Sequence, residues 1–411
     1  MATTSVNPLD ALLVSEKFLI DPYPTLHRLR SEDPVFWSDS IGGWILTRYD
    51  DIVPTFKDVG IYSNAGRLAK IVEYLPAESR AKFKTLEDHY RATSLIFSDP
   101  PDHTRLRSLV TKVFNATRVE ALRPRIQEAI NQSLDAVQGD GEMDVIRDIA
   151  VPLPFAILGS ILGIPASDRR AVKTWADELL GFQGVNKPSE SALAVGQDAL
   201  VNVRQYLRDI IEERRRKPED DLLSHLVAAE TEGEKLSETE LVYTCTTLLV
   251  AGHETTTSLI GNGLYTILHH PDQWMLLREN PSLLGSAVEE MLRYESPIAR
   301  QPRLVKQDTE LGGKRILAGQ VVFQMLNAAN RDPAYFADPD LFDIRRQPNR
   351  HMAFGMGIHF CVGALLARTE GQIVFRTLLE RMPQLQLADE KPDWDLRKPA
   401  ARMLHSLRVA F

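Results

Sequence analysis

Residues 354–363 read FGMGIHFCVG and contain Cys361, one of only two cysteines in the 411-residue chain. A free cysteine is usually a buried structural thiol, but this one stands in a loop among three glycines. Gly355, Gly357 and Gly363 let backbone N–H groups approach the sulfur and leave room for a flat ligand above it. We therefore predict that Cys361 performs chemistry.

An apolar stripe follows this loop. Val362, Leu365, Leu366 and Ile373 recur with the helical period and predict a helix that begins directly after Cys361. Unpaired N–H groups and the dipole at a helix N-terminus stabilise a thiolate. A nucleophilic cysteine enzyme is an alternative, although the sequence places no second histidine to act as its base.

A second, much longer helix is predicted from Ser237 to His269. Ser237 and Glu240 have the spacing of a capping box, and Pro271 ends the helix. About 33 residues at a rise of 1.5 Å give a length of roughly 50 Å. Because the middle of this helix is apolar on most of its sides, we expect the helix to cross the protein interior. Cys245 lies among its apolar residues and is expected to be a structural thiol.

Residues 251–256, in the middle of this helix, read AGHETT. A zinc protease would need His-Glu-x-x-His, and Thr257 stands where the second histidine is required, so that class is excluded. A carboxylate such as Glu254 costs several kcal/mol inside an apolar helix unless it has a partner or a function. Thr255 can return its hydroxyl to the carbonyl of Ala251, which bends a helix and opens a groove.

The cysteine loop resembles the haem-binding signature of the cytochrome P450 family, of the soluble bacterial type. The positions that match Phe-Gly-x-Gly-x-His-x-Cys-x-Gly are Phe354, Gly355, Gly357, His359, Cys361 and Gly363. The resemblance implies that Cys361 is the axial thiolate ligand of haem b, an iron protoporphyrin IX.

AGHETT is similar to the oxygen-binding motif of the same family, Ala/Gly-Gly-x-Asp/Glu-Thr. The resemblance implies two catalytic residues: Thr255 hydrogen-bonds to the oxygen that is being activated, and Glu254 relays protons to it from solvent. Gly252 is expected to remove a side chain where a small ligand lies. His253 occupies the variable position and is assigned no role.

Haem carries two propionates, which need cations or hydrogen-bond donors. By the resemblance these come from His103, Arg107, Arg303 and His359. Residues 98–110, SDPPDHTRLRSLV, predict a helix capped by Ser98 or Asp99, on which the first two of these side chains share a face.

The segment VEEMLRYESP, residues 288–297, holds Glu290 and Arg293 three positions apart. Taken alone this is an exposed pair worth a few tenths of a kcal/mol, and Glu289 would serve equally well. With the other motifs it resembles the Glu-x-x-Arg of the family, completed by Arg346 or its neighbour Arg345, of which the spacing favours Arg346. The implied role is a buried ion network that fixes the backbone leading to the cysteine.

The resemblance covers essentially the whole chain, from DPYPTLHRLR at residues 21–30 to a C-terminal hairpin. It implies the cytochrome P450 fold, mainly α with a smaller β region, which we expect as a single domain over residues 1–411 and as a monomer. Aromatic and β-branched runs around glycine pairs predict hairpins at 34–49 and 310–323.

Composition excludes other classes. The net charge of −8 argues against a nucleic-acid binder, and two cysteines cannot build a disulfide framework. The N-terminal residues lack the pattern of a signal peptide, and no run approaches the roughly 18 apolar residues of a membrane span. We expect a cytoplasmic protein without a membrane anchor.

Substrate contacts are expected, by the resemblance, from the segment after residue 60, residues near 175–195, the middle of the long helix, residues 297–301 and the C-terminal turn. The matching positions are small or apolar: Val250, Ala251, Ile298, Ala299 and Leu404. Since no charged anchor stands out, we expect a mostly apolar substrate such as a terpenoid, steroid, fatty acyl chain or macrolide.

The implied function is a monooxygenase that activates O2 and hydroxylates or epoxidises this substrate. Electrons would come from a ferredoxin or flavodoxin-type donor with its reductase, docked on a basic patch for which Lys112, Arg105 and Arg350 are candidates. Two alternatives remain. A peroxide-driven peroxygenase would not need Glu254 and Thr255, and a haem-thiolate binding or gas-sensing protein would need no proton relay.

Overall fold

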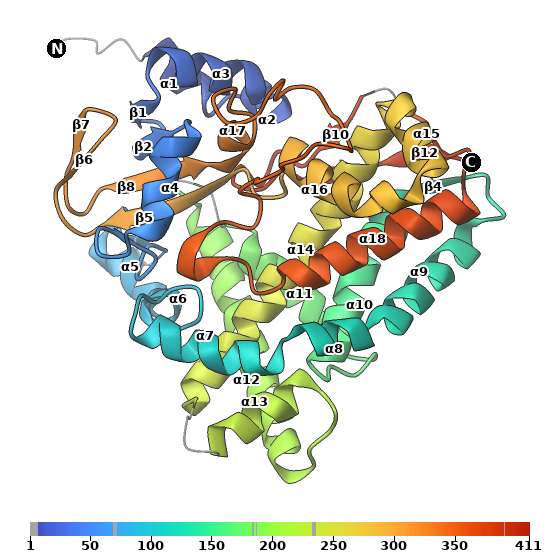
Figure 1. Cartoon of the computed structure of the whole chain (residues 1–411). Helices are drawn as coiled ribbons and strands as arrows, with labels where there is room; N and C mark the ends of the chain where they lie inside the picture. Colours follow the sequence, from blue (N-terminus) through green and yellow to red (C-terminus); the bar gives the residue numbers. More distant parts are fainter. Residues whose placement is uncertain (1–6, 69–71, 183–184, 186, 232–235, 390) are drawn as a thin grey trace.

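The computed structural model describes residues 7–68, 72–182, 185, 187–231, 236–389 and 391–411. Helices make up most of it. The strands of the largest sheet gather on the left in Figure 1, whereas β4 (Glu142–Asp144) and β12 (Arg408–Ala410) lie on the right. The α-helices are α1 (Pro8–Leu12), α2 (Glu16–Ile20), α3 (Tyr23–Glu32), α4 (Tyr49–Lys57), α5 (Ala77–Lys82), α6 (Lys84–Arg91), α7 (Asp102–Val113), α8 (Ala116–Ala121), α9 (Arg123–Val137), α10 (Pro152–Ile161), α11 (Arg169–Leu180), α12 (Glu190–Arg216), α13 (Leu222–Thr231), α14 (Glu238–Leu268), α15 (Pro271–Glu279), α16 (Leu284–Tyr294), α17 (Leu326–Asn330) and α18 (Ala364–Arg381).

The largest sheet has the strand order β1-β2-β8-β5-β3. The strands of the chain are β1 (Val35–Ser38), β2 (Gly43–Leu46), β3 (Tyr62–Ser63), β4 (Glu142–Asp144), β5 (Arg300–Val305), β6 (Thr309–Leu311), β7 (Lys314–Ile316), β8 (Val321–Met325), β9 (Gln386–Leu387), β10 (Asp393–Trp394), β11 (Leu404–Ser406) and β12 (Arg408–Ala410). The predicted hairpin at 34–49 is confirmed, because β1 and β2 pair antiparallel with Val35 opposite Leu46.

One strand prediction needs correction. The hairpin expected at 310–323 is shorter and consists of β6 and β7. Its turn is made by Gly312 and Gly313, both at positive φ, whereas β8 leaves this ribbon and joins the large sheet. The C-terminal hairpin is present, because the consecutive strands β10 and β11 pair antiparallel, and β12 lies between β4 and β9.

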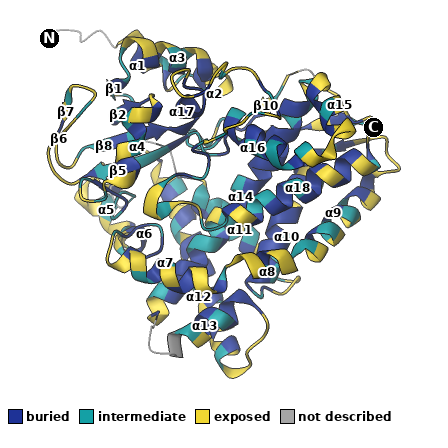
Figure 2. Cartoon of the chain, viewed as in Figure 1, coloured by how far each residue is buried: buried dark blue, intermediate teal, exposed yellow. Residues whose placement is uncertain are grey.

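The long helix α14 agrees with its prediction. Ser237 and Glu240 form a reciprocal capping box, and the helix ends at Leu268. Nineteen of its 31 residues are buried, and Figure 2 shows buried residues running through α14, α16 and α18. Cys245 is 0% exposed, and burial raises the pKa of its thiol to about 12, so it is a structural thiol as expected. Among the described helices, none combines the length and apolar character that a bilayer span requires.

Two helix starts bear on the site. α18 begins at Ala364, directly after the cysteine loop as predicted, although Leu365 lies on its exposed face. The cap predicted for the helix after residue 98 is wrong. α7 begins at Asp102, and the Oγ of Ser98 instead accepts from the N–H of Ser94. The carboxylate of Asp99 accepts from Ser63 and Asn64, so it ties α7 to the end of β3.

Candidate active site

A cavity of about 760 Å³ separates α14 from the loop that precedes α18. Its wall on the α14 side includes Ala251, Glu254 and Thr255, and the opposite wall includes Phe354 and Cys361. The two motifs that carry the sequence prediction therefore face the same space, although about a hundred residues separate them in the chain.

Glycines shape the cysteine loop. Gly355 and Gly357 have φ angles of 67° and 68°, which side-chain-bearing residues rarely adopt. A Cβ at Gly357 would lie 2.5 Å from the carbonyl oxygen of Phe56, so the loop packs directly against the end of α4. The N–H of Cys361 donates to the carbonyl of Phe354 at 3.0 Å, which closes the loop. The glycines thus serve close backbone packing as well as access to the sulfur.

The thiol of Cys361 faces opposing influences. Burial by the surrounding protein raises its pKa, while the backbone N–H groups of Gly363 and Ala364 and the charges of Arg107 and Arg368 lower it. Burial is the largest of these, and the N–H groups at the start of α18 act in the direction that the helix N-terminus predicts. A coordinated metal ion would outweigh the burial, because a coordinating thiol is deprotonated outright.

Five basic side chains cluster beside the cysteine loop. The family-implied residues His103, Arg107, Arg303 and His359 are all present, and Arg67 joins them. The rings of His103 and His359 lie 4.1 Å apart. Among the residues that the structure describes, none of the five forms an ion pair with a carboxylate.

This concentration of positive charge is costly without an anion. Burial, reinforced by the neighbouring cations, lowers the pKa of His359 to about 2 and that of Arg303 to about 9. Burial lowers the pKa of Arg67 to about 10. Both ring nitrogens of His103, Nε2 of His359 and Nε of Arg67 are buried without a hydrogen-bond partner. Ionised carboxylates accept hydrogen bonds from guanidinium and imidazole N–H groups such as these, so the residues fit the two propionates of haem.

Thr255 and Gly252 shape the α14 wall. The hydroxyl of Thr255 donates to the carbonyl of Ala251 at 3.1 Å, as predicted. A Cβ at Gly252 would lie 3.0 Å from Leu158 of α10, and both residues line the cavity. The missing side chain therefore leaves room both for the contact between the two helices and at the cavity wall.

Glu254 is held by a residue that the sequence prediction missed. Its carboxylate accepts a hydrogen bond from Nζ of Lys398, and both side chains are 17% exposed. The neighbouring His253 is buried and contacts Asp177 of α11 through Nε2 at 2.9 Å. Asp177 also pairs with Lys173 at 2.5 Å. Glu254 thus has Lys398 as its partner and lies beside a second charged cluster, since ligand atoms of Glu254, His253 and Asp177 all lie within 4.8 Å of one another.

Glu290 forms a buried ion network. Arg293 binds both of its carboxylate oxygens at 2.8 Å, and Arg346 binds one of them at 3.1 Å. Both arginines also donate to the carbonyl of Leu341. Arg345 is exposed and pairs with Asp343 instead, so the spacing argument selected the arginine that contacts Glu290.

Glu289, the other candidate partner for Arg293, has different contacts. Its carboxylate binds Arg368 of α18 at 2.6 Å and His351 at 3.1 Å. The guanidinium of Arg368 lies 4.4 Å from the ring centroid of Phe354. Two parallel ion networks therefore brace the segment that leads into the cysteine loop, one from Glu290 and one from Glu289.

Substrate contacts are placed only in part. Val250, Ala251 and Ile298 line the cavity. Leu404 does not, because it is 1% exposed in the core against Gly261 of α14. Ala299 is not among the lining residues either, and its N–H donates to the carbonyl of Ala400 at 3.0 Å. Within the predicted wall at 175–195, residues 183, 184 and 186 lie outside the described part of the chain.

Three lining residues gave no signal in the sequence. Arg67, His89 and Lys398 reach the cavity from separate segments. Lys398 meets a partner 144 positions away, and no motif surrounds any of the three. The sequence analysis expected no charged side chain among the substrate contacts. That expectation is wrong, because the ion pair of Glu254 and Lys398 lines the cavity.

Glu370 of α18 is a buried carboxyl at the cavity edge. It is 2% exposed, Oε2 has no hydrogen-bond partner, and burial raises its pKa from 4.5 to about 8. Because the folded chain holds this proton more tightly than the unfolded chain, its contribution to stability is complete below pH 4.5 and is lost as pH rises to about 8.

We expect Glu370→Gln to remove that dependence. Each unit of pKa difference corresponds to about 1.4 kcal/mol, so the wild-type free energy of unfolding should fall by several kcal/mol relative to the variant between about pH 5 and pH 8. Urea unfolding at a series of pH values measures this. Glu380→Gln, on the exposed face of the same helix, is the control and should parallel the wild type. A Glu370→Gln curve parallel to the wild type would contradict the prediction.

Comparison with known proteins finds similar chains over most of the sequence. The family model described as Cytochrome P450 matches residues 186–404. The biotin biosynthesis cytochrome P450 of Bacillus subtilis (strain 168) is 40% identical over 400 residues, which cover 97% of this chain and 98% of that protein. Vitamin D(3) 25-hydroxylase of Pseudonocardia autotrophica is 40% identical and covers 94% of this chain and 93% of its own length. The crystal structure of P450BioI with acyl carrier protein ligated to hexadec-9Z-enoic acid superimposes with a TM-score of 0.88 at 39% identity and covers 97% of this chain and 100% of that one.

Proposed function

Since the chain belongs to the cytochrome P450 family and is a monooxygenase, we propose that it inserts one oxygen atom of O2 into a mostly apolar small molecule held in the cavity. The observation that carries this proposal is the position of Cys361 opposite Glu254 and Thr255 in one cavity, beside a cluster of basic side chains that form no ion pair with a carboxylate among the described residues. The proposed cofactor is haem b.

Each group then has a task. Cys361 would hold the iron as a thiolate, and the basic cluster of Arg67, His103, Arg107, Arg303 and His359 would hold the two propionates. When bound, haem supplies the oxygen chemistry. Glu254 would hold a proton at its carboxylate, and Thr255, whose hydroxyl is fixed on the carbonyl of Ala251, would present its oxygen to the cavity.

Replacing Thr255 by alanine should uncouple oxygen use from product. The variant loses the hydroxyl on the cavity wall that controls the proton, so product formed per NADPH consumed should fall several-fold while hydrogen peroxide rises. A surrogate reductase, an oxygen electrode and a peroxide assay measure this. Thr247→Ala, which also changes a cavity-lining threonine, is the control and should stay coupled. Unchanged coupling in Thr255→Ala would favour the peroxide-driven alternative.

The substrate class follows from the cavity wall. Most of the lining is apolar, and it includes Leu95, Phe97, Leu158, Leu179 and Val250. Two similar proteins support this class through their names, one with an acyl chain on its carrier protein and one with vitamin D3. We propose a terpenoid, steroid, fatty acyl chain or macrolide.

A substrate-binding screen tests this. Ligands that displace water from the ferric iron change its optical spectrum, and hits are then examined for oxygenated products. Apolar compounds of the four classes should give the shift. A panel in which only small, highly polar compounds did so would overturn the substrate class. A protein that shifts with ligand but forms no oxygenated product with any reductase would be a binding or sensing protein.

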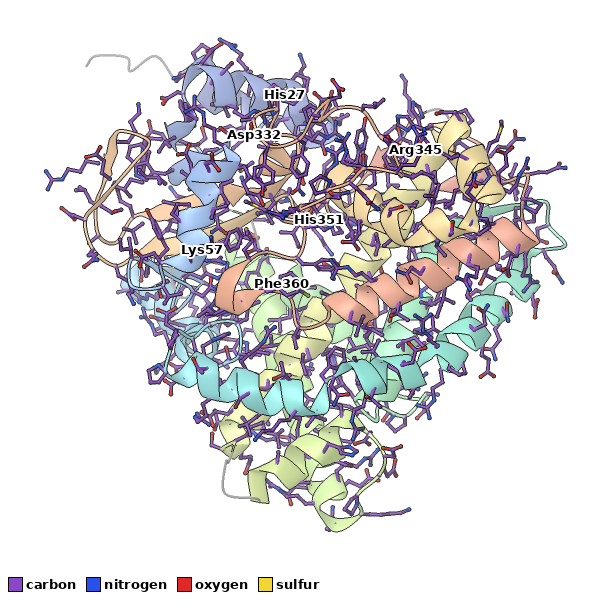
Figure 3. The ribbon with its side chains drawn as sticks, in the orientation of Figure 1. His27, Lys57, Asp332, Arg345, His351 and Phe360 are labelled. Atoms are coloured by element: carbon purple, nitrogen blue, oxygen red, sulfur yellow. The ribbon has the colours of Figure 1, made fainter. Side chains whose placement is uncertain are left out.

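The proposed electron donor is a ferredoxin or flavodoxin-type protein that docks over the cysteine loop. Ile358, Phe360 and Leu365 are exposed there, and Figure 3 shows Phe360 on this loop with Lys57 on the same face of the molecule. Arg350 and Lys112 are also exposed. Arg105 is a weaker candidate than expected because it pairs with Glu240.

Charge reversal tests this surface. Replacing Lys112 and Arg350 by glutamate should slow reduction by an acidic donor several-fold at low salt, and the difference from the wild type should shrink as salt screens the charges. Stopped-flow reduction under carbon monoxide measures the rate. Arg278→Glu, on α15, is the control. An unchanged rate and salt dependence would place the docking site elsewhere.

A further inference from the structure

Glu289, Arg368 and His351 form a charged cluster that the proposed mechanism does not use. Arg368 of α18 donates to both carboxylate oxygens of Glu289 on α16, through Nε at 2.6 Å and through Nη2 at 2.8 Å. Nε2 of His351 contacts the same carboxylate at 3.1 Å. The side chains of Arg368 and Glu289 are 29% and 26% exposed, so water reaches this cluster only in part.

The three side chains together carry no net charge at neutral pH. Burial raises the pKa of Glu289, but hydrogen bonds from Arg368 and His351 outweigh it and lower the pKa to about 2, so the carboxylate is ionised. Nδ1 of His351 accepts from the N–H of Ala353 at 3.2 Å, which leaves Nε2 as the donor to Glu289. The neutral imidazole therefore satisfies both contacts, and the charges of Arg368 and Glu289 cancel.

Arg368 lies close to the loop that holds the sulfur. Its guanidinium is 4.4 Å from the ring centroid of Phe354, and the carbonyl of Phe354 accepts the N–H of Cys361 at 3.0 Å. Burial raises the pKa of the Cys361 thiol, and the charge of Arg368 is among the influences that lower it. Arg368 therefore stabilises negative charge on the sulfur. Because Phe354 and Cys361 both line the cavity, the same positive charge acts on a group bound there.

A positive charge beside a thiolate-bound metal favours the reduced metal, because it attracts the electron that is added. It also weakens electron donation by the sulfur, and charges and hydrogen bonds around a ligand are among the factors that set the reduction potential of an iron centre. Glu289 opposes this effect, since it binds the guanidinium of Arg368 through both oxygens in a partly buried place.

We infer that Glu289 and Arg368 set the reduction potential of the haem bound to Cys361, in that Arg368 raises the potential and Glu289 lowers it. This rests on the proposed function and gives a role to two residues that touch no reacting atom. The reduction concerned is the uptake of one electron from the ferredoxin or flavodoxin-type donor, with no bond made or broken. A cluster that only braced the loop would affect folding and haem retention instead.

Removing one charge at a time tests this on the haem-loaded protein. Glu289→Gln leaves the positive charge of Arg368, so the potential should rise. Arg368→Gln leaves the negative charge of Glu289, so the potential should fall. Each shift should correspond to about a threefold to tenfold change in the equilibrium constant for reduction, where tenfold is about 59 mV for one electron. Spectroelectrochemical titration with small mediators measures the potential without the protein donor.

Three further variants separate charge from packing. The double variant Glu289→Gln/Arg368→Gln restores a net charge of zero, and Arg368→Lys keeps the charge but loses the bidentate contact. Arg376→Gln is the control, because it removes an exposed positive charge about 12 Å further along α18. In all three the equilibrium constant for reduction should stay within about twofold of the wild type, since no new net charge arises beside Cys361 and distant exposed charges are screened.

Shifts of the same sign in Glu289→Gln and Arg368→Gln, or no shift in either, would overturn the assignment and leave the cluster a brace for the loop. The reduced carbon monoxide spectrum and the thermal midpoint show whether each variant is folded and loaded. If one single variant does not load, the sign of the shift in the other decides. A normal wild-type spectrum with the wrong signs rejects this inference alone, whereas an abnormal wild-type spectrum rejects the proposed function.

Discussion

Cys361→Ser should abolish the strongly red-shifted Soret band that a cysteinate-ligated haem shows when it is reduced under carbon monoxide. Serine keeps the size and the backbone of the loop, so the hydrogen bond from N–H of residue 361 to the carbonyl of Phe354 remains. What is lost is the soft, electron-donating sulfur, which favours cleavage of the O–O bond. Monooxygenase activity should fall below detection, while the basic cluster should still retain some haem.

The second cysteine supplies the control. Cys245→Ser changes a thiol in the core of α14, so it should lower stability but leave the position of the band unchanged. A wild-type protein that lacks the band would refute the assignment of the ligand. Retention of the band in Cys361→Ser would refute it equally.

Glu290→Ala should destabilise the fold by about 3–5 kcal/mol, since it leaves the buried charges of Arg293 and Arg346 without their carboxylate. Arg293 is 0% exposed, so water cannot replace the lost partner. Both arginines also hold carbonyls of residues 337–341, the segment that approaches the cysteine loop. The variant should therefore bind haem more weakly as well as unfold more easily.

Urea unfolding and the fraction of haem lost to apomyoglobin measure the two effects. Arg345→Ala is the matched control, because this exposed neighbour pairs only with Asp343 among the residues described, and it should change the free energy of unfolding by less than about 0.5 kcal/mol. A Glu290→Ala protein as stable as this control would show that the network contributes little to the fold.

Several features were predictable because they depend on neighbours in the chain. The hairpin at 34–49, the capping box at Ser237 and the start of α18 behind Cys361 are local, set by turn residues, caps and hydrophobic period. The bond from Thr255 to Ala251 spans one helical turn, so it could also be foreseen. The predictions failed where residues distant in the chain compete for the same hydrogen-bonding side chain. Asp99 binds Ser63 and Asn64, and Ser98 binds Ser94, so neither side chain caps α7.

By itself the sequence determined the family of this protein and predicted its chemistry, because a thiol loop and an acid–alcohol pair are encoded in short contiguous motifs. Only the tertiary structure decided which other groups share their cavity: the tie of Lys398 to Glu254 and the place of Arg67 in the basic cluster. These depend on contacts between segments far apart in the chain, where burial and charge are fixed by packing and leave no periodic or spacing signal.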